Sequence, residues 1–176
     1  NIFDKTKIEN GFFEYSNLIL DNIKSYSINY IRDLAEINYD YKQIVSYIVF
    51  HNNKNIFLME RSKNASEKKL KNKLSIGIGG HLTMLDLHKN YIDWGMREFY
   101  EEVDYYHNFD MKVIGLINDQ SNNLGKLHLG IVYLMSGTSD QIKIKSELKS
   151  GRLVSIEECY SFYDQLESWS QLTINF

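Results

Sequence analysis

The sequence predicts an α+β protein built around a mixed β-sheet, and three observations lead to this fold class. Short apolar runs separated by turn-forming residues fill the middle of the chain, which is typical of strands. Apolar residues at helical spacing occur near both ends and once between the runs. The 176 residues, 43% hydrophobic and 24% charged, fit a single globular unit with a sizeable core.

Charge and cysteine content narrow the class of protein. The net charge of −3 gives no general surface for a polyanion, so we expect no stable nucleic-acid partner. Cys159 is the single cysteine, which excludes an intrachain disulfide and favours a cytoplasmic location; we expect it to be a small buried hydrophobe. No apolar run approaches the roughly 20 residues that span a bilayer, and no leader pattern begins the chain, so we expect no membrane partner.

The N-terminal segment should be helical. Apolar residues fall near helical spacing over residues 12–38, with a polar interruption at Ser25–Asn29. We assign residues 1–41 to an N-terminal helical extension packed on the core, and residues 42–176 to the main domain.

A β-hairpin should follow this extension. Gln43–Phe50 and Asn55–Glu60 are apolar runs of strand length, and His51–Lys54 between them is turn-like. Leu74–Ile78 is a further short strand. The charged segment Arg61–Lys73 is expected to be a solvated loop, with a positive rim for a phosphate-bearing substrate as the alternative.

The second half of the chain should add three strands and a closing helix. The predicted strands are Met111–Ile117, Leu127–Met135 and Gln141–Ser146. The last should be half-exposed, because its polar and apolar residues alternate. A turn at Asn118–Gly125 separates the first two. The helix Glu157–Leu166 should begin with a capping box formed by Ser155 and Glu158.

A helix predicted over Tyr91–Val103 carries the most informative pattern. At 100° per residue, one apolar stripe of this helix should face the core. The stripe consists of Ile92, Met96, Phe99 and Val103. Glu98, Glu101 and Glu102 lie well off it, and their i, i+3 and i+4 spacing places three carboxylates on one face.

Three carboxylates at this spacing repel one another, and a purely structural helix gains nothing from the arrangement. Mg²⁺ and Mn²⁺ prefer carboxylate oxygens and would turn the repulsion into attraction. From the helix alone, a solvated acidic face remains open as the alternative. Gly79 and Gly80 close the strand before the helix, and paired glycines let a backbone approach an anionic ligand closely, which favours a site.

With these residues, the sequence resembles the Nudix (MutT-like) hydrolases, whose motif is G-x5-E-x7-R-E-U-x-E-E-x-G-U, with U an apolar residue. Arg97–Glu102 (REFYEE) matches R-E-U-x-E-E in full, and Gly80 would be the opening glycine. The resemblance covers roughly residues 42–160. Within the family, the sequence is similar to the predicted-phosphoesterase branch. The segments that carry this further likeness are Ser75–His81, Gly115–Asp119 and Gly125–Tyr133.

Three features depart from the motif. The loop between Gly80 and Arg97 is about three residues longer than the motif allows. Counting back from Arg97 puts Lys89 at the first acidic position, and Asp86 is the nearest acid in the loop. Asp86 would then bind metal or cap the loop, and the sequence leaves both open. Asp104 replaces the glycine that follows the glutamate pair.

The resemblance implies a Nudix α/β/α sandwich with a mixed central sheet, plus the N-terminal helical segment. It implies hydrolysis of a phosphoanhydride bond in a nucleoside-diphosphate-linked or related small molecule. Glu98, Glu101 and Glu102 would hold Mg²⁺ or Mn²⁺, and Arg97 would orient a carboxylate by a salt bridge. A non-hydrolytic nucleotide- or metabolite-binding domain, and a non-hydrolytic enzyme such as an isomerase, are the alternatives on this fold. Many such domains dimerise, so a homodimer is compatible with the family.

The general base has two candidates, Glu98 and Glu147. The second follows the alternating strand, where a solvent-facing loop glutamate is the competing interpretation. Gly79, Gly80 and His81 are the candidates for contact with the substrate phosphates.

Three further residues are assigned mainly to packing. His128 lies in an apolar run and shares a face with Gly130, so we expect a hydrogen-bonded sheet histidine. Trp94 and Trp169 are expected to pack in the core.

Overall fold

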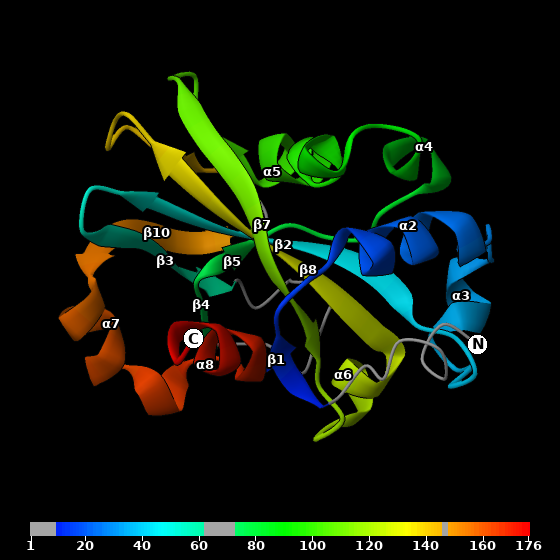
Figure 1. The fold of residues 1–176 in the computed structure, drawn as a ribbon. Coiled ribbons are helices and arrows are strands. Elements are labelled where there is room, and N and C mark those ends of the chain that lie inside the picture. The colour runs from blue at the N-terminus through cyan, green and yellow to red at the C-terminus, as the bar shows by residue number, and fades with distance from the viewer. Residues whose placement is uncertain (1–9, 62–72, 146–147) are drawn as a thin grey trace.

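The fold is a mixed β-sheet with helices on both of its faces (Figure 1), as the computed structural model of residues 10–61, 73–145 and 148–176 shows. The strand order is β1-β7-β8-β2-β3-β10, with β4 paired to β3 and β5 paired to β2. The strands are β1 (Gly11–Phe13), β2 (Gln43–Asn52), β3 (Asn55–Arg61), β4 (Leu74–Ser75), β5 (Gly77–Ile78), β7 (Phe109–Asn118), β8 (His128–Gly137) and β10 (Leu148–Ser155). Among the strands described, only β2 and β8 pair in parallel, so the expected α+β class with a mixed sheet is confirmed.

The helices are short and lie on the two faces of the sheet. They are α2 (Asn17–Tyr26), α3 (Arg32–Ala35), α4 (Met84–Leu87), α5 (Met96–Glu102), α6 (Asn123–Leu127), α7 (Ile156–Ser161) and α8 (Ser168–Ile174). Tyr91–Asp93 and Tyr163–Gln165 form 3₁₀ turns, and β6 (Val103–Asp104) pairs with β9 (Lys143–Ile144) as a small second sheet. Within the described ranges, no helix is long and apolar enough to cross a bilayer.

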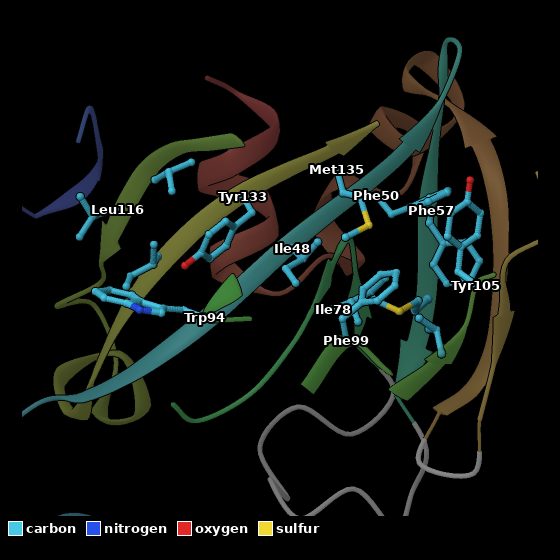
Figure 2. Close-up of a cluster of buried hydrophobic side chains, with 14 of the residues drawn as sticks. Ile48, Phe50, Phe57, Ile78, Trp94, Phe99, Tyr105, Leu116, Tyr133 and Met135 are labelled. Atoms are coloured by element: carbon cyan, nitrogen blue, oxygen red, sulfur yellow. The ribbon is translucent and has the colours of Figure 1, made fainter. Parts of the chain in front are cut away.

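Two hydrophobic clusters form the core, one on each face of the sheet. Figure 2 shows the first, in which Ile48 and Phe50 of β2 pack with Trp94 and with Phe99 of α5. The second lies under α7 and α8 and includes Tyr47 of β2. Successive strand residues point to opposite faces, so β2 contributes side chains to both clusters. The expected burial of Trp94 and of Cys159, which belongs to the second cluster, is confirmed.

The predicted hairpin is present. β2 and β3 pair through His51 with Ile56 and Asn52 with Asn55, and the turn between them holds Asn53 at φ 53°. Asparagine tolerates this left-handed backbone better than other residues that carry a side chain, which explains its place in the turn.

The N-terminal segment differs from the helix predicted over residues 12–38. Gly11–Phe13 forms a strand that pairs with the end of β7, because the sheet edge offers backbone partners that local helical spacing does not reveal. Helix α2 begins after Ser16, whose side chain accepts a hydrogen bond from the amide of Ile19 at 3.3 Å. The break between α2 and α3 includes part of the polar stretch Ser25–Asn29, where the sequence placed the interruption.

The helix predicted over Tyr91–Val103 is shorter than expected. A 3₁₀ turn comes first, and α5 starts only after Gly95. A side chain at Gly95 would come within 2.8 Å of Ile48 Cδ1, so glycine permits α5 to pack closely on β2. Phe99 and Val103 of the predicted apolar stripe are fully buried, and Ile92 and Met96 are partly buried against the same hydrophobic cluster.

The C-terminal prediction is correct at its start. Ser155 caps α7 by accepting a hydrogen bond from the amide of Glu158 at 3.1 Å. The Glu158 carboxylate contacts Arg152 at 2.7 Å, and no return bond to Ser155 occurs, so the capping box is half formed. The predicted helix ends at Ser161, and α8 is an additional element.

Candidate active site

Asp86 anchors the loop that leads into the acidic helix α5. Its Oδ2 atom accepts hydrogen bonds from the amide and the hydroxyl of Thr83, at 2.9 and 2.8 Å, which closes a capping box at α4. Oδ2 also accepts from Arg97 Nη2 at 3.0 Å, and Oδ1 lies 3.5 Å from Lys89 Nζ. Both carboxylate oxygens are therefore engaged, so Asp86 caps the loop, which answers a question that the sequence left open.

The charge state of Asp86 follows from these partners. Burial raises the pKa of the Asp86 carboxyl, but the hydrogen bonds from Arg97 and Thr83 outweigh it and hold the pKa below its ordinary value. The carboxylate is thus ionised, although its side chain is only 2% exposed. Counting forward from Gly80, five residues precede Asp86, as five precede the first glutamate of the motif. The three additional residues therefore come after Asp86, and counting back from Arg97 had missed this correspondence.

Arg97 connects the loop with the acidic helix. Its guanidinium lies 2.8 Å from the carboxylate of Glu98 and 3.2 Å from that of Glu101, in addition to the contact with Asp86. Nη2 also donates to the carbonyl of His81 at 2.9 Å. The hydrogen bond to Asp86 raises the pKa of Arg97 further above its ordinary value. Arg97 therefore carries a permanent positive charge among three carboxylates.

Glu98 packs directly under the glycine pair. A Cβ atom placed on Gly80 would collide with the Oε2 atom of Glu98, so a side chain there would displace this carboxylate. Gly79 adopts φ +144°, and a side chain there would collide with the carbonyl of Ser46. Burial raises the pKa of Glu98 even though Arg97 lowers it, so the charged form of Glu98 is disfavoured relative to that of an exposed glutamate.

The other two carboxylates of α5 differ in exposure. Glu102 is buried, and its Oε2 atom accepts a hydrogen bond from the amide of Gly79 at 3.3 Å. The side chain of Glu101 is 57% exposed and contacts Arg97. Glu98, Glu101 and Glu102 nevertheless line one cavity of about 790 Å³, together with Gly79 and Gly80. Across the described ranges, no group of three or more acidic, histidine or cysteine side chains is arranged to hold a metal ion without rearrangement.

His81 and His128 form a pair in the wall of the same cavity. Their Nε2 atoms lie 3.0 Å apart, and His128 Nδ1 donates to the carbonyl of Leu124 at 2.7 Å. Since a carbonyl oxygen only accepts, His128 carries a proton on Nδ1, and one of the two facing Nε2 atoms donates to the other. Burial, followed by the nearby His128 and Arg32, lowers the pKa of His81 to about 4. The expectation of a hydrogen-bonded, buried His128 is confirmed.

A second cavity of about 760 Å³ adjoins the first. Both are lined by Arg32, His81, Arg97 and Glu98. The wall of the second cavity includes residues of the N-terminal segment, which sequence patterns did not connect with the acidic helix.

Several residues for which the sequence predicted a role lie outside the described residues or have surroundings other than those expected. Glu147 and most of the charged segment Arg61–Lys73 lie outside the described residues. Lys73 lies in the wall of the first cavity, where its Nζ atom donates to the carbonyl of Asp164 at 3.2 Å. Trp169 packs edge-on against Tyr47 and also lines this cavity, so it is only partly a core residue.

This chain resembles known proteins both in sequence and in fold. No family model matches the chain. Protein YmaB of Bacillus subtilis (strain 168) is 31% identical over 152 residues, which cover 80% of this chain and 73% of YmaB. The crystal structure of Tm1382, a candidate Nudix hydrolase, is 25% identical with a TM-score of 0.81, covering 98% of this chain and 91% of Tm1382. The MutT protein from Methanosarcina mazei Go1, at 18% identity, shares the fold with a TM-score of 0.55 over 77% of this chain and 89% of its own.

Proposed function

This chain belongs to the Nudix family, and from that premise we propose that it is a metal-dependent pyrophosphohydrolase. Its substrate would be a nucleoside-diphosphate-linked or related small molecule that contains a phosphoanhydride bond. The observation that carries the proposal is the arrangement of α5, in which Glu98, Glu101 and Glu102 all line one cavity beside Gly79 and Gly80. A net charge of −3 favours a small-molecule substrate over a nucleic acid.

The donor set fits Mg²⁺ or Mn²⁺ by its chemistry. Carboxylate oxygens are the ligands that these ions prefer, and three of them line the same cavity. Two of the three, Glu98 and Glu101, contact Arg97, so metal binding requires these side chains to turn away from the guanidinium. An ion held by Glu98, Glu101 and Glu102 would stabilise negative charge on the phosphates and activate a bound water.

The remaining residues would position the substrate and move a proton. Arg97, fixed by Asp86, orients the acidic helix against the glycine loop. Gly79, Gly80 and His81 would contact the substrate phosphates, because all three line the cavity beside the carboxylates. Glu98 is the first candidate for the general base, because burial raises its pKa and makes its carboxylate more basic than an exposed one. Glu147 remains the second candidate.

A turnover assay tests the proposal. Purified protein with Mg²⁺ or Mn²⁺ should release phosphate-containing products from at least one of a panel of nucleoside triphosphates, dinucleotides, nucleotide sugars and ADP-ribose. Glu101→Gln and Glu102→Gln should each lower this activity by orders of magnitude without lowering the melting temperature. Glu157→Gln, an exposed acidic residue of α7, is the matched control. Absence of product across the panel would favour a non-hydrolytic binding domain or another enzyme class, and loss of folding in the variants would favour a structural role.

A further inference from the structure

The N-terminal segment builds a second compartment beside the candidate active site. Tyr26 at the end of α2, Tyr30, and Tyr41 before β2 line the cavity of about 760 Å³. Arg97 and Glu98 line the same cavity, so the compartment opens onto the acidic helix. A molecule that binds there can therefore extend from the N-terminal segment to the catalytic carboxylates.

Two aromatic rings pack against each other in the wall of this compartment. The rings of Tyr30 and Tyr41 are 5.2 Å apart, and the two residues are 40% and 46% exposed. They come from opposite ends of the segment that contains α3, so the fold brings them together although ten residues lie between them. Exposed ring faces at a cavity offer a planar ligand a surface for stacking.

Tyr41 is held in place by its neighbour. The Nζ atom of Lys42 donates to the carbonyls of Gly125 and Lys126, both at 2.8 Å, and of His128 at 3.1 Å. These three bonds use all the donors of an ammonium group, so Lys42 fixes the chain and has no donor left for a ligand.

Arg32 supplies a positive charge between the two compartments. It lines both cavities, and its Nε atom donates to Glu36 at 3.1 Å on the solvent side. Within the described ranges, its two terminal nitrogens make no hydrogen bond. The positive charge of Arg97, in contrast, is balanced by ion pairs with three carboxylates. Arg32 is therefore the guanidinium that can receive an anionic group in this region.

We propose that Tyr30, Tyr41 and Arg32 form a binding subsite for a nucleoside diphosphate, with the base stacked on the tyrosines and a phosphate on Arg32. The inference rests on the proposed function, since the bound diphosphate would extend toward Glu98. It assigns substrate selection to the N-terminal extension, outside the segment that carries the catalytic motif.

Binding measured without turnover tests the subsite. ADP, inorganic pyrophosphate and a branched alkyl diphosphate are titrated into the full chain in EDTA, and each Kd is determined by calorimetry. ADP should bind at least tenfold more tightly than the other two. Tyr30→Leu should weaken ADP about tenfold and leave pyrophosphate unchanged, consistent with the effect of removing one base–aromatic stack. Arg32→Ala should weaken both ligands.

Exposed residues outside both cavities provide the controls. Tyr106→Leu and Arg152→Ala should bind ADP as the unchanged protein does. Tyr41→Leu repeats the test if Tyr30→Leu lowers the melting temperature. An unchanged ADP Kd in a folded tyrosine variant, or a tighter Kd for the alkyl diphosphate, overturns the subsite.

The same variants separate the subsite from the proposed function. Binding of ADP that depends on Tyr30, without product release in Mg²⁺ or Mn²⁺, supports the subsite and contradicts the hydrolase. Hydrolysis that is indifferent to Tyr30 and Tyr41 supports the hydrolase and contradicts the subsite.

Discussion

Arg97 Nη2 donates to Asp86 Oδ2 at 3.0 Å, and this contact joins the loop after Gly80 to the acidic helix. The carboxylate is almost entirely buried, whereas the Arg97 side chain is 34% exposed. The contact therefore fixes one end of the guanidinium in the interior and leaves the other beside Glu98 and Glu101.

Asp86→Asn should destabilise the protein. Removing one partner of a buried ion pair costs about 3–5 kcal/mol, and the exposure of Arg97 together with its remaining carboxylates reduces our expectation to roughly 1–2 kcal/mol. Urea denaturation at pH 7 measures the change, with exposed Asp110→Asn as the control.

The same variant should alter the pH dependence of stability. The folded-state pKa of Asp86 is depressed, so its contribution is present above the unfolded pKa of about 4 and is lost as the pH falls through the lowered value. Asp86→Asn should remove this part of the acid sensitivity. An acid profile identical to that of the unchanged protein would contradict the ion pair.

Glu98→Gln should stabilise the fold while it abolishes turnover. The folded-state pKa of Glu98 is raised, so its favourable contribution exists below the unfolded pKa and is lost as the pH rises through the raised value. A neutral side chain restores it, and we expect a gain of up to about 1 kcal/mol at pH 7. A lower melting temperature for Glu98→Gln would show that its contact with Arg97 outweighs the cost of burial.

Gly80→Ala should displace the Glu98 carboxylate, because the new methyl group would occupy the space of Oε2. Activity should fall at least tenfold, whereas stability should fall by less than about 1 kcal/mol, because the carboxylate ends a flexible side chain that can move aside. Turnover and urea denaturation of Gly80→Ala measure the two effects. Unchanged turnover in the folded variant would refute the steric explanation.

His81 should contribute to acid sensitivity in a higher pH range. Burial and the adjacent His128 lower its pKa from 6.5 to about 4, so the neutral form stabilises the fold above about pH 6.5, and this stability is lost between there and about pH 4. The loss should be of the order of 2–3 kcal/mol. His81→Gln should flatten the stability profile in this interval, while exposed His107→Gln should leave it unchanged.

Lys42→Met should destabilise the start of β8. Three carbonyl groups lose their donor, and hydrogen bonds to charged groups contribute about 1.5–3 kcal/mol. Hydrogen exchange at the amides of residues 125–129 should accelerate in Lys42→Met and remain unchanged in the exposed-residue control Lys112→Met. Unchanged exchange would mean that water replaces the ammonium group without cost.

The elements predicted correctly are those with strong local patterns. The hairpin of β2 and β3 has two apolar runs and a polar turn, and Met96 and Phe99 of α5 keep the helical spacing that predicted its apolar face. Such patterns depend on neighbouring residues alone, so they can be read without the rest of the fold.

The missed features depend on distant parts of the chain. Strand β1 has three residues and exists because β7 offers it an edge. The match of Asp86 to the motif was hidden because counting from Arg97 crosses the additional loop residues. The aromatic compartment joins Tyr30 and Tyr41 to α5 through packing, and no spacing in the sequence encodes that contact.

The short strand β1 also determines how the protein can be shortened. Its residues Gly11–Phe13 cover the end of β7, and the ring of Phe12 lies over Gly115. Removing the first 13 residues would leave these backbone groups as an open sheet edge bordered by apolar side chains, a template for pairing between molecules. A deletion that removes Gly11–Phe13 should therefore increase self-association relative to the full chain.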